Sequence, residues 1–159
     1  MRILAIDPGF ERLGIAVIEK KGAVEEVLHS ECFRTSAKEK FERRLFIIGE
    51  KVRTIIEKWG PRALSIERLY IETNQKTAMR VAEARGVCVY EAGRAGLPIY
   101  EFTPLQVKVA VSGYGKADKR QMMAMVRKLV KIPATSDSDD ELDAIAIGLT
   151  CFATVKFPS

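Results

Sequence analysis

Acidic residues fall at four positions in this sequence where a metal could bind. Asp7 and Glu67 each follow a short apolar run, and Asp140 and Asp143 lie three residues apart near the C-terminus. A carboxylate at the end of a buried strand must be paired or bind a cation, because an isolated buried charge is unfavourable. A ligand set of carboxylate oxygens, without Cys or His, favours Mg²⁺ or Mn²⁺ over zinc.

The elements around Asp7 and Glu67 predict that these two acids share one edge of a sheet. The apolar run before Asp7 ends in the turn dipeptide Pro8-Gly9, and a second apolar run begins at Leu13, as in a hairpin. The run that begins at Ala63 reads as a further short strand ending at Glu67. If this strand is a parallel neighbour of the first, both acids lie at the rim where open α/β sheets bind ligands.

The pair Asp140 and Asp143 belongs to a predicted helix that runs from Asp140 to about Phe152. Residues three apart share a helix face, and the helix N-terminus favours carboxylates. Alone, such a pair is more typical of a charged first turn. Together with Asp7 and Glu67, it predicts four carboxylates that repel one another and need cations to stay ionised. Two such ions roughly 4 Å apart can activate water and stabilise the leaving oxygen in phosphodiester cleavage.

The remaining pattern predicts a mixed five-stranded sheet flanked by helices. Ser36 and Glu39 form a capping-box pattern for a helix that continues to Trp59, where Gly60 follows. Small residues on the helix 75–92 suit close packing, either inside the fold or against a second subunit. The other predicted elements are a strand at 22–33, a strand at 99–102, a helix that starts with Thr103-Pro104, and a helix at 122–129.

A glycine-flanked basic segment provides candidate phosphate contacts. Lys116, Lys119 and Arg120 lie close together after Gly113 and Gly115, and the net charge of the chain is +5. A basic protein with carboxylates at strand ends suggests a polyanionic substrate that is cut at a metal centre. The alternative is a solvated connection between two helices.

Length and composition exclude several protein classes. The 159 residues, 47% hydrophobic and 30% charged, predict one globular domain spanning 1–159. The sequence shows no apolar stretch near the roughly 20 residues of a membrane span and no secretory signal pattern. We therefore expect a cytoplasmic protein without membrane contact. Three scattered cysteines argue against a disulfide framework and against structural zinc.

Taken together, the motifs resemble the RuvC family of Holliday-junction resolvases, in the ribonuclease H-like superfamily. The motifs that carry the resemblance are Ile6-Asp7-Pro8-Gly9 with Gly14, Arg34-Thr35, Ile66-Glu67 with Tyr70 and Asn74, Ala84-Arg85-Gly86, Thr103-Pro104 with Val107-Lys108, Gly113-Tyr-Gly115 with Ala117-Asp118-Lys119, and Asp140-Glu-Leu-Asp143-Ala144-Ile145-Ala146. They extend over nearly the whole chain, and their order and spacing are highly specific.

The resemblance implies a homodimeric, Mg²⁺-dependent endonuclease that nicks two strands of like polarity in a four-way DNA junction. It implies two Mg²⁺ ions in each active site, with Mn²⁺ as a substitute, and a branch-migration helicase complex as a partner. The metal-binding acids of the family correspond to Asp7, Glu67, Asp140 and Asp143. These are the four positions that the pattern of strands and helices had already selected.

The resemblance also assigns positions to the DNA. Lys108 and Lys119 match the basic residues near the scissile phosphate, and Lys119 is the candidate for balancing its charge. Tyr70 matches an aromatic that inserts into the junction, usually Phe. We also expect Asn74, Lys116 and Arg120 to contact the nucleic acid. This chain has Glu-Leu between Asp140 and Asp143, where the family often has Ala-Ala.

Three alternative functions remain at this point. One is a ribonuclease H-like nuclease that acts on RNA or on another branched nucleic acid. Another is a non-cleaving junction-binding module. A third, an actin-like or sugar-kinase-type ATPase, shares an Asp-Pro-Gly loop but needs two lobes and a much longer chain.

For Arg85, on the small-residue helix, we expect an intramolecular pairing.

Overall fold

The computed structural model of the chain describes residues 1–69, 75–132 and 138–157. The strands are β1 (Arg2–Asp7), β2 (Arg12–Lys21), β3 (Val24–Arg34), β4 (Leu64–Glu67) and β5 (Ile99–Phe102). The helices are α1 (Phe41–Trp59), α2 (Gln75–Arg94), α3 (Pro104–Ser112), α4 (Lys119–Leu129) and α5 (Asp139–Thr154).

The strands of the described residues form one mixed sheet in the order β3-β2-β1-β4-β5. β1 pairs with β2 and β2 with β3 in antiparallel fashion, whereas β4 runs parallel to both β1 and β5. β1 is therefore the central strand, and its residues 3–6 are fully buried. The predicted mixed five-stranded sheet flanked by helices is confirmed, and so is the parallel pairing of the strands that carry Asp7 and Glu67.

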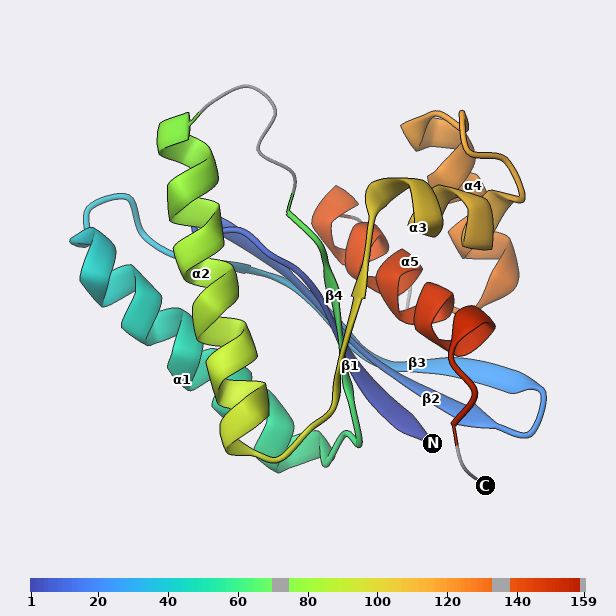
Figure 1. The fold of residues 1–159 in the computed structure, drawn as a ribbon, viewed down its shortest axis with the longest axis horizontal. Coiled ribbons are helices and arrows are strands. Elements are labelled where there is room, and N and C mark those ends of the chain that lie inside the picture. The colour runs from blue at the N-terminus through green and yellow to red at the C-terminus, as the bar shows by residue number, and fades with distance from the viewer. Residues whose placement is uncertain (70–74, 133–137, 158–159) are drawn as a thin grey trace.

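The helices cover both faces of the sheet (Figure 1). α1 and α2 lie on one face, and α5 with α3 and α4 lies on the other. Successive residues of a strand point to opposite faces, so Leu4 and Ile6 contribute to the core beneath α1 and α2. Ile3 and Ala5 contribute to the core beneath α5. The two cores hold the sheet edge with the acidic residues between two helical layers.

α5 is buried around most of its circumference, and residues 144–152 are all buried. A helix that is apolar on all sides has no solvent face and lies inside a fold. Gly148 allows it to lie directly on the sheet, because a Cβ there would be 2.5 Å from Ile18 Cδ1 and 3.1 Å from Ala5 Cβ. This close contact places the first turns of α5 beside the end of β1.

The start of α1 differs from the prediction. The helix begins at Phe41 with Lys40 as its N-cap residue, and no side chain caps it. Ser36 instead forms a local turn, in which its Oγ accepts a hydrogen bond from the Lys38 backbone N–H at 3.2 Å. Because a serine hydroxyl can bond to the backbone two residues ahead, the capping-box prediction at Ser36 was wrong.

α3 begins as predicted, whereas α4 begins at Lys119, before the predicted start at Met122. Thr103 and Gln106 form a reciprocal capping box at the start of α3, with Pro104 as its first residue. Asp118 and Gln121 form a second capping box, which starts α4 at Lys119. Each box satisfies backbone N–H groups that have no partner within the helix and holds the first turn of its helix in place.

In the described part of the chain, no helix has both the length and the apolar character that crossing a membrane requires.

Candidate active site

Asp7 and Glu67 lie side by side at one edge of the sheet. The parallel register pairs Ile6 of β1 with Ile66 of β4, so the acids that follow occupy equivalent positions on neighbouring strands. Each acid is the last residue of its strand. The expectation that the two acids share a rim is confirmed.

Asp143 comes to the same place from the first turns of α5. Gly14, the partner of Asp7 in the β1–β2 ladder, makes this approach possible. A Cβ on Gly14 would lie 2.1 Å from the carbonyl oxygen of Asp140 and 3.1 Å from Asp7 Cβ. Only a residue without a side chain allows the helix backbone so close to the strand. Gly14 thus accounts for the short distance between α5 and the end of β1.

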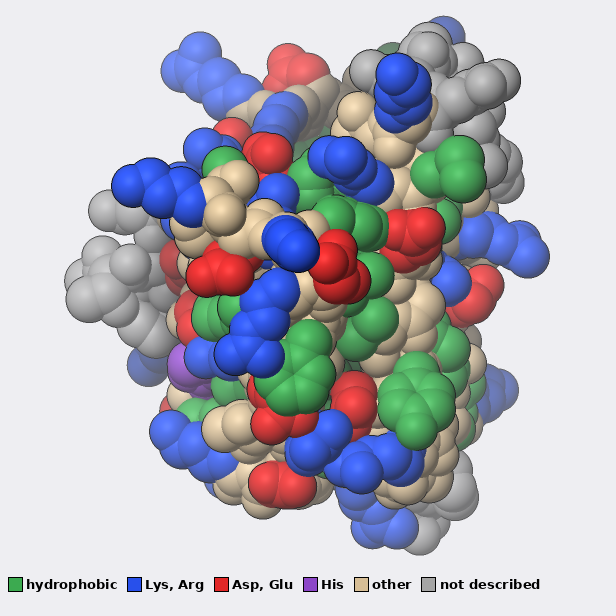
Figure 2. All heavy atoms as spheres, turned by 90° about the vertical axis from the view of Figure 1, so that its left-hand side faces the viewer, with side chains coloured by type: hydrophobic (Ala, Val, Ile, Leu, Met, Phe, Trp, Pro, Cys, Tyr) green, Lys and Arg blue, Asp and Glu red, His purple; other side chains and the backbone are tan. Residues whose placement is uncertain are grey.

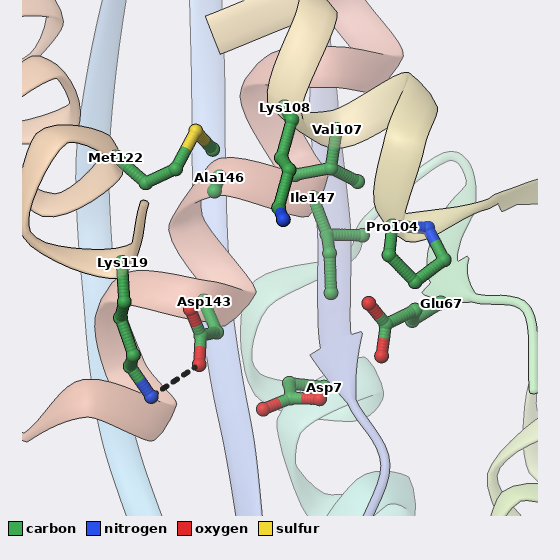
Figure 3. Close-up of a pocket in the computed structure, with 10 residues that line it drawn as sticks. All are labelled: Asp7, Glu67, Pro104, Val107, Lys108, Lys119, Met122, Asp143, Ala146 and Ile147. Carbon is green, nitrogen blue, oxygen red and sulfur yellow. Dashed lines mark hydrogen bonds and ion pairs between the residues drawn. The ribbon is translucent and has the colours of Figure 1, made fainter. Parts of the chain in front are cut away.

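The three acids face one pocket together with two lysines (Figure 3). The pocket encloses about 220 Å³ and is lined by Asp7, Glu67, Asp143, Lys108 and Lys119. Apolar side chains from α3, α4 and α5 form the rest of its wall. The five functional groups come from five elements, β1, β4, α5, α3 and α4, so their meeting is a product of the tertiary fold.

Asp140 does not line this pocket. Its carboxylate lies on another side of the first turn of α5, where it forms an ion pair with Arg12 (Nη1 to Oδ2, 3.7 Å). The thiol of Cys32 donates a hydrogen bond to the same oxygen at 3.4 Å. The structure therefore brings three of the four predicted acids together and directs the fourth toward β2 and β3.

Burial and, after it, mutual repulsion disfavour the ionised acids of the pocket. Burial is the largest cause that raises the pKa of Asp7 from 3.8 to about 8. The charges of Glu67, Asp143 and Asp140 act in the same direction, and that of Lys119 opposes them. Burial and the charge of Asp143 likewise raise the pKa of Glu67. A cation would remove this repulsion, and a donor set of oxygens alone suits Mg²⁺ or Mn²⁺.

The acids surround the pocket without meeting at one point. Among the described residues, no three Asp, Glu, His or Cys side chains already form a ready-made metal site. A cation shared by Asp7, Glu67 and Asp143 therefore requires their side chains to rotate toward it. The donor chemistry fits a hard divalent ion, and side-chain rotations supply the remaining adjustment.

Lys119 connects α4 to the acids of α5. Its Nζ lies 3.3 Å from Asp143 Oδ2 and 3.3 Å from Asp139 Oδ2. Burial would lower the pKa of Lys119, but Asp143 and Asp139 outweigh it, so the pKa is raised and the ammonium stays charged. Asp139 was not among the predicted site residues, so this contact was not anticipated. The capping box that starts α4 at Lys119 is the signal that could have indicated it.

The other predicted nucleic-acid contacts are less close to the pocket. Lys116 and Arg120 are exposed on the α3–α4 connection and the first turn of α4, and neither lines the pocket. Tyr70 and Asn74 lie outside the described residues.

Glu141 points away from the pocket. It is 8% exposed, and its carboxylate accepts hydrogen bonds from Ser30 Oγ at 2.9 Å and from Ser138 Oγ at 3.2 Å. Ser138 is also the N-cap residue of α5. The acid that departs from the family pattern thus fastens the start of α5 to β3.

Arg85 holds the end of β4 from α2. Its Nε donates a hydrogen bond to the carbonyl oxygen of Glu67 at 3.1 Å, and its Nη2 donates one to Glu101 Oε1 at 2.5 Å. The predicted intramolecular pairing is confirmed. The sequence did not indicate which elements this pairing joins. The Arg85 guanidinium links α2 to β4, at the backbone of Glu67, and to β5, at Glu101.

Comparisons with known proteins identify the family of this chain. The family model described as "Crossover junction endodeoxyribonuclease RuvC" matches residues 3–151. A RuvC from Roseiflexus sp. strain RS-1 is 41% identical over 148 residues, which cover 93% of this chain and 88% of that protein. A RuvC from Ruminiclostridium cellulolyticum is 41% identical over 149 residues, covering 94% and 90%.

Among solved structures, Thermus thermophilus RuvC in complex with Holliday junction substrate has a TM-score of 0.88 and 33% identity, covering 94% of this chain and 92% of that one. The yeast mitochondrial resolvase Ydc2 is only 16% identical, with a TM-score of 0.70, and supports the fold alone. The predicted ribonuclease H-like fold is confirmed. The chain belongs to the RuvC family, as its motifs predicted.

Proposed function

We propose that this chain is an endonuclease that resolves four-way DNA junctions by hydrolysing phosphodiesters in two strands of like polarity. The observation that carries the proposal is the pocket in which Asp7, Glu67 and Asp143 face Lys108 and Lys119. Carboxylates that hold cations and ammonium groups that hold phosphate are the two components of metal-dependent phosphodiester hydrolysis. Membership of the RuvC family supports the junction as substrate.

The acids of the pocket would hold Mg²⁺, with Mn²⁺ as a substitute. Asp7, Glu67 and Asp143 are the ligands that already face the same space, and Asp140 would join them by leaving Arg12. When bound, two such ions would supply Lewis-acid chemistry, activating an attacking water and offsetting the charge on the leaving oxygen. The raised pKa of Asp7, caused first by burial and then by the neighbouring acids, supports the proposal, because a bound cation would favour the ionised carboxylate.

The lysines act on the phosphate. Lys119 remains protonated at neutral pH, since its pKa is raised, and it lies beside the acids where the scissile phosphate would enter. An ammonium held there stabilises the extra negative charge of the transition state. Lys108 extends from α3 toward the same pocket and would bind a second oxygen of the phosphate (Figure 3).

Exposed basic groups near the pocket would hold the rest of the junction. We assign Lys116 and Arg120 to phosphate contacts, which make binding depend on salt. Tyr70 and Asn74 are assigned to the unpaired bases on the basis of the family motif. Stacking of Tyr70 on one base would contribute about 1–3 kcal/mol.

A homodimer would supply two sites for the two strands. The α1–α2 side of the molecule carries hydrophobic patches between Lys and Arg side chains (Figure 2). On α2, Met79 is 62% exposed and Tyr90 is 65% exposed, with Gly86 between them on the exposed side of the helix. An exposed apolar stripe of this kind is typical of a protein contact.

Family membership also supports a cytoplasmic location and a branch-migration helicase as partner.

The test is a cleavage assay that compares a synthetic four-way junction with linear duplex, nicked duplex and an RNA–DNA hybrid in Mg²⁺. We expect cleavage of the junction alone. Asp7→Asn and Glu67→Gln should bind the junction without cutting it, and Glu57→Gln, on the exposed side of α1, should cut normally. Preferential cleavage of the hybrid would instead support the RNA-directed alternative. Junction binding without cleavage by the wild-type chain would support a binding module.

A further inference from the structure

A second surface near the acids combines aromatic rings with cations. Phe10 lies three residues after Asp7, and Phe41 begins α1; their rings meet edge to face with centroids 5.7 Å apart. Arg80 of α2 lies over both, with its guanidinium carbon 5.8 Å from the Phe10 centroid and 5.1 Å from the Phe41 centroid. Cation–π contacts of this kind hold the guanidinium in place without a carboxylate.

These groups line a groove of about 430 Å³, to which Lys76 and Glu83 of α2 also contribute. Lys76 and Arg80 form no ion pair with any carboxylate that the structure describes, Glu83 included. The groove therefore offers Arg80, which two aromatic rings hold in place, and the exposed Lys76 against a single acid. Its excess positive charge favours an anionic ligand.

A buried arginine, Arg44, holds one wall of the groove in place through its contacts with Phe10 and Thr35. Arg44 is 5% exposed, its Nε donates to Thr35 Oγ1 at 2.7 Å, and its Nη2 donates to the carbonyl oxygen of Phe10 at 3.2 Å. The guanidinium carbon also lies 5.0 Å from the centre of the Phe10 ring. These contacts fix the turn between β1 and β2, so that the position of Phe10 is tied to that of Asp7.

The groove and the acidic pocket lie at the same edge of the sheet but on opposite faces. Phe10 packs with the core under α1 and α2, whereas Met122 and Val107 of the pocket belong to the core under α5. Figure 1 shows the N-terminal ends of α1 and α2 on the same upper side of the molecule as the ends of β4 and β5. A DNA strand that crosses this edge of the sheet through the acidic pocket would next reach the groove.

We propose that the groove formed by Phe10, Phe41, Lys76 and Arg80 is a second DNA-binding site, which binds backbone phosphates of the strand that leaves the cleavage pocket on the α1–α2 side. The inference rests on the proposed junction-cleaving function. Lys76 and Arg80 bind the phosphates, and the phenylalanine rings hold Arg80 and contact the adjacent sugar. Met79, which also lines the groove, belongs to the exposed stripe assigned to the dimer. At Lys76 and Arg80 themselves a second copy is a poorer ligand, because a symmetric contact there would bring like charges together.

The experiment measures binding of a labelled four-way junction, in EDTA, at several salt concentrations. The double variant Lys76→Gln with Arg80→Gln should raise Kd roughly tenfold near 100 mM salt and reduce the slope of log K against log salt by about 2, since each phosphate contact contributes about 0.9. Its cleavage rate at saturating protein in Mg²⁺ should remain within about twofold of wild type, because the acids and Lys119 are untouched.

The matched control removes two cations at the far end of α1. Lys58→Gln with Arg62→Gln changes the net charge equally and should leave the slope unchanged; both positions are exposed, and Lys58 also lies over an aromatic ring. The charge-conserving pair Lys76→Arg with Arg80→Lys should keep the wild-type slope. Equal melting temperatures would show that each variant folds.

The outcomes separate this inference from the proposed function. If the wild-type chain neither binds nor cuts the junction, the proposed function fails and the groove fails with it. If it binds and cuts while the Lys76 and Arg80 variant keeps the slope of the control, only the groove is refuted. Loss of dimerisation in sedimentation, with an unchanged salt slope, would assign the groove to a subunit contact and also overturn it.

Discussion

At the scale of single residues, stability and chemistry conflict most clearly at Asp7. Its carboxylate is buried at the end of the central strand, close to Glu67 and Asp143, and its pKa is raised to about 8. The ionised form that a cation needs is therefore the form that the folded protein disfavours. Enzymes commonly keep such unfavourable groups because binding a ligand offsets them.

Replacing Asp7 by asparagine should stabilise the metal-free protein. A folded-state pKa of about 8, above the ordinary 3.8, means that the contribution of Asp7 to stability is complete below pH 3.8 and is lost as pH rises through 8. The amide side chain of the variant cannot ionise and avoids that loss. In EDTA at pH 8 or above, Asp7→Asn should gain at least about 1 kcal/mol, or about 2–4 °C in melting temperature.

Differential scanning calorimetry across pH checks this expectation. The advantage of Asp7→Asn should grow from pH 5 to pH 8 and shrink when Mg²⁺ is added, because only the wild type gains from the cation. Glu57→Gln, at an exposed position, serves as the control and should show no such pH trend. A difference between Asp7→Asn and wild type that is constant over this range would show that ionisation of Asp7 is not its origin.

The sequence allowed Asp7 and Glu67 to be paired because each acid follows a strand, and strand ends are locally encoded. It did not allow the direction of Asp140 to be predicted. That carboxylate turns toward Arg12 and Cys32, both of which lie far away in the chain. Helical spacing limits which side a residue occupies, but the partner that attracts its side chain is a tertiary property.

At the scale of elements, Arg85 joins α2 to the ends of β4 and β5. Replacing it with Lys should raise the Mg²⁺ concentration needed for half-maximal cleavage several-fold, because Glu67 loses the hydrogen bond that holds its backbone. The maximal rate in excess Mg²⁺ should change little, since Arg85 does not line the pocket. The melting-temperature rise caused by Mg²⁺ should decrease in parallel, which gives a readout independent of activity.

Arg94→Ala is the matched control for Arg85→Lys. Arg94 lies on the same helix and pairs with Glu91, away from β4. Arg94→Ala should leave the Mg²⁺ concentration needed for half-maximal cleavage unchanged. If Arg85→Lys and Arg94→Ala lower stability equally and neither changes the Mg²⁺ requirement, Arg85 has a purely structural role.

The contact of α5 with the sheet predicts a strong effect at Gly148. A methyl group there would lie 2.5 Å from Ile18 Cδ1 and 3.1 Å from Ala5 Cβ, so Gly148→Ala should lower the free energy of unfolding by about 1–3 kcal/mol. Gly93→Ala, where no atom lies within 4 Å of the added Cβ, should be neutral or slightly stabilising. Urea unfolding of both variants checks the difference, and equal effects would contradict the packing argument.

Elements could be predicted from sequence wherever their signals are local. The capping residue Thr103 with Pro104 indicated the start of α3, and apolar periodicity indicated the body of α1. The start of α1 was wrong because Ser36 had two backbone partners within reach, and the sequence does not show which it takes. The position of α5 across β1 and β2 was also inaccessible, since it depends on two glycines, Gly14 and Gly148, that lack side chains where backbones meet.

At the scale of the whole molecule, the two faces of the sheet have different uses. α3, α4 and α5 bring the lysines and Asp143 to the strand ends on one face. α1 and α2 cover the other face and expose the apolar stripe of α2. Because Arg85 of α2 also binds the backbone of Glu67, the helix that would meet a second copy contacts the acidic site directly. In the proposed dimer, assembly and catalysis would therefore be connected through one helix.

The exposed stripe predicts how assembly can be removed without unfolding the chain. No atom lies within 4 Å of a Cβ built on Gly86, so Gly86→Glu fits the isolated chain but would place a charge at the centre of an α2–α2 contact. We expect monomers in sedimentation equilibrium and a melting temperature that no longer depends on protein concentration. Ala153→Glu, exposed near the end of α5, should remain dimeric.

The products of cleavage by Gly86→Glu would then report on the coupling of the two sites. A dimer holds two acidic pockets on one junction, so both strands are cut within the lifetime of a single complex. A monomer cuts one strand and dissociates, and nicked junctions should accumulate before linear duplexes appear, which native gels resolve. Paired cleavage by a variant that sedimentation shows to be monomeric would mean that the second cut does not need the second pocket.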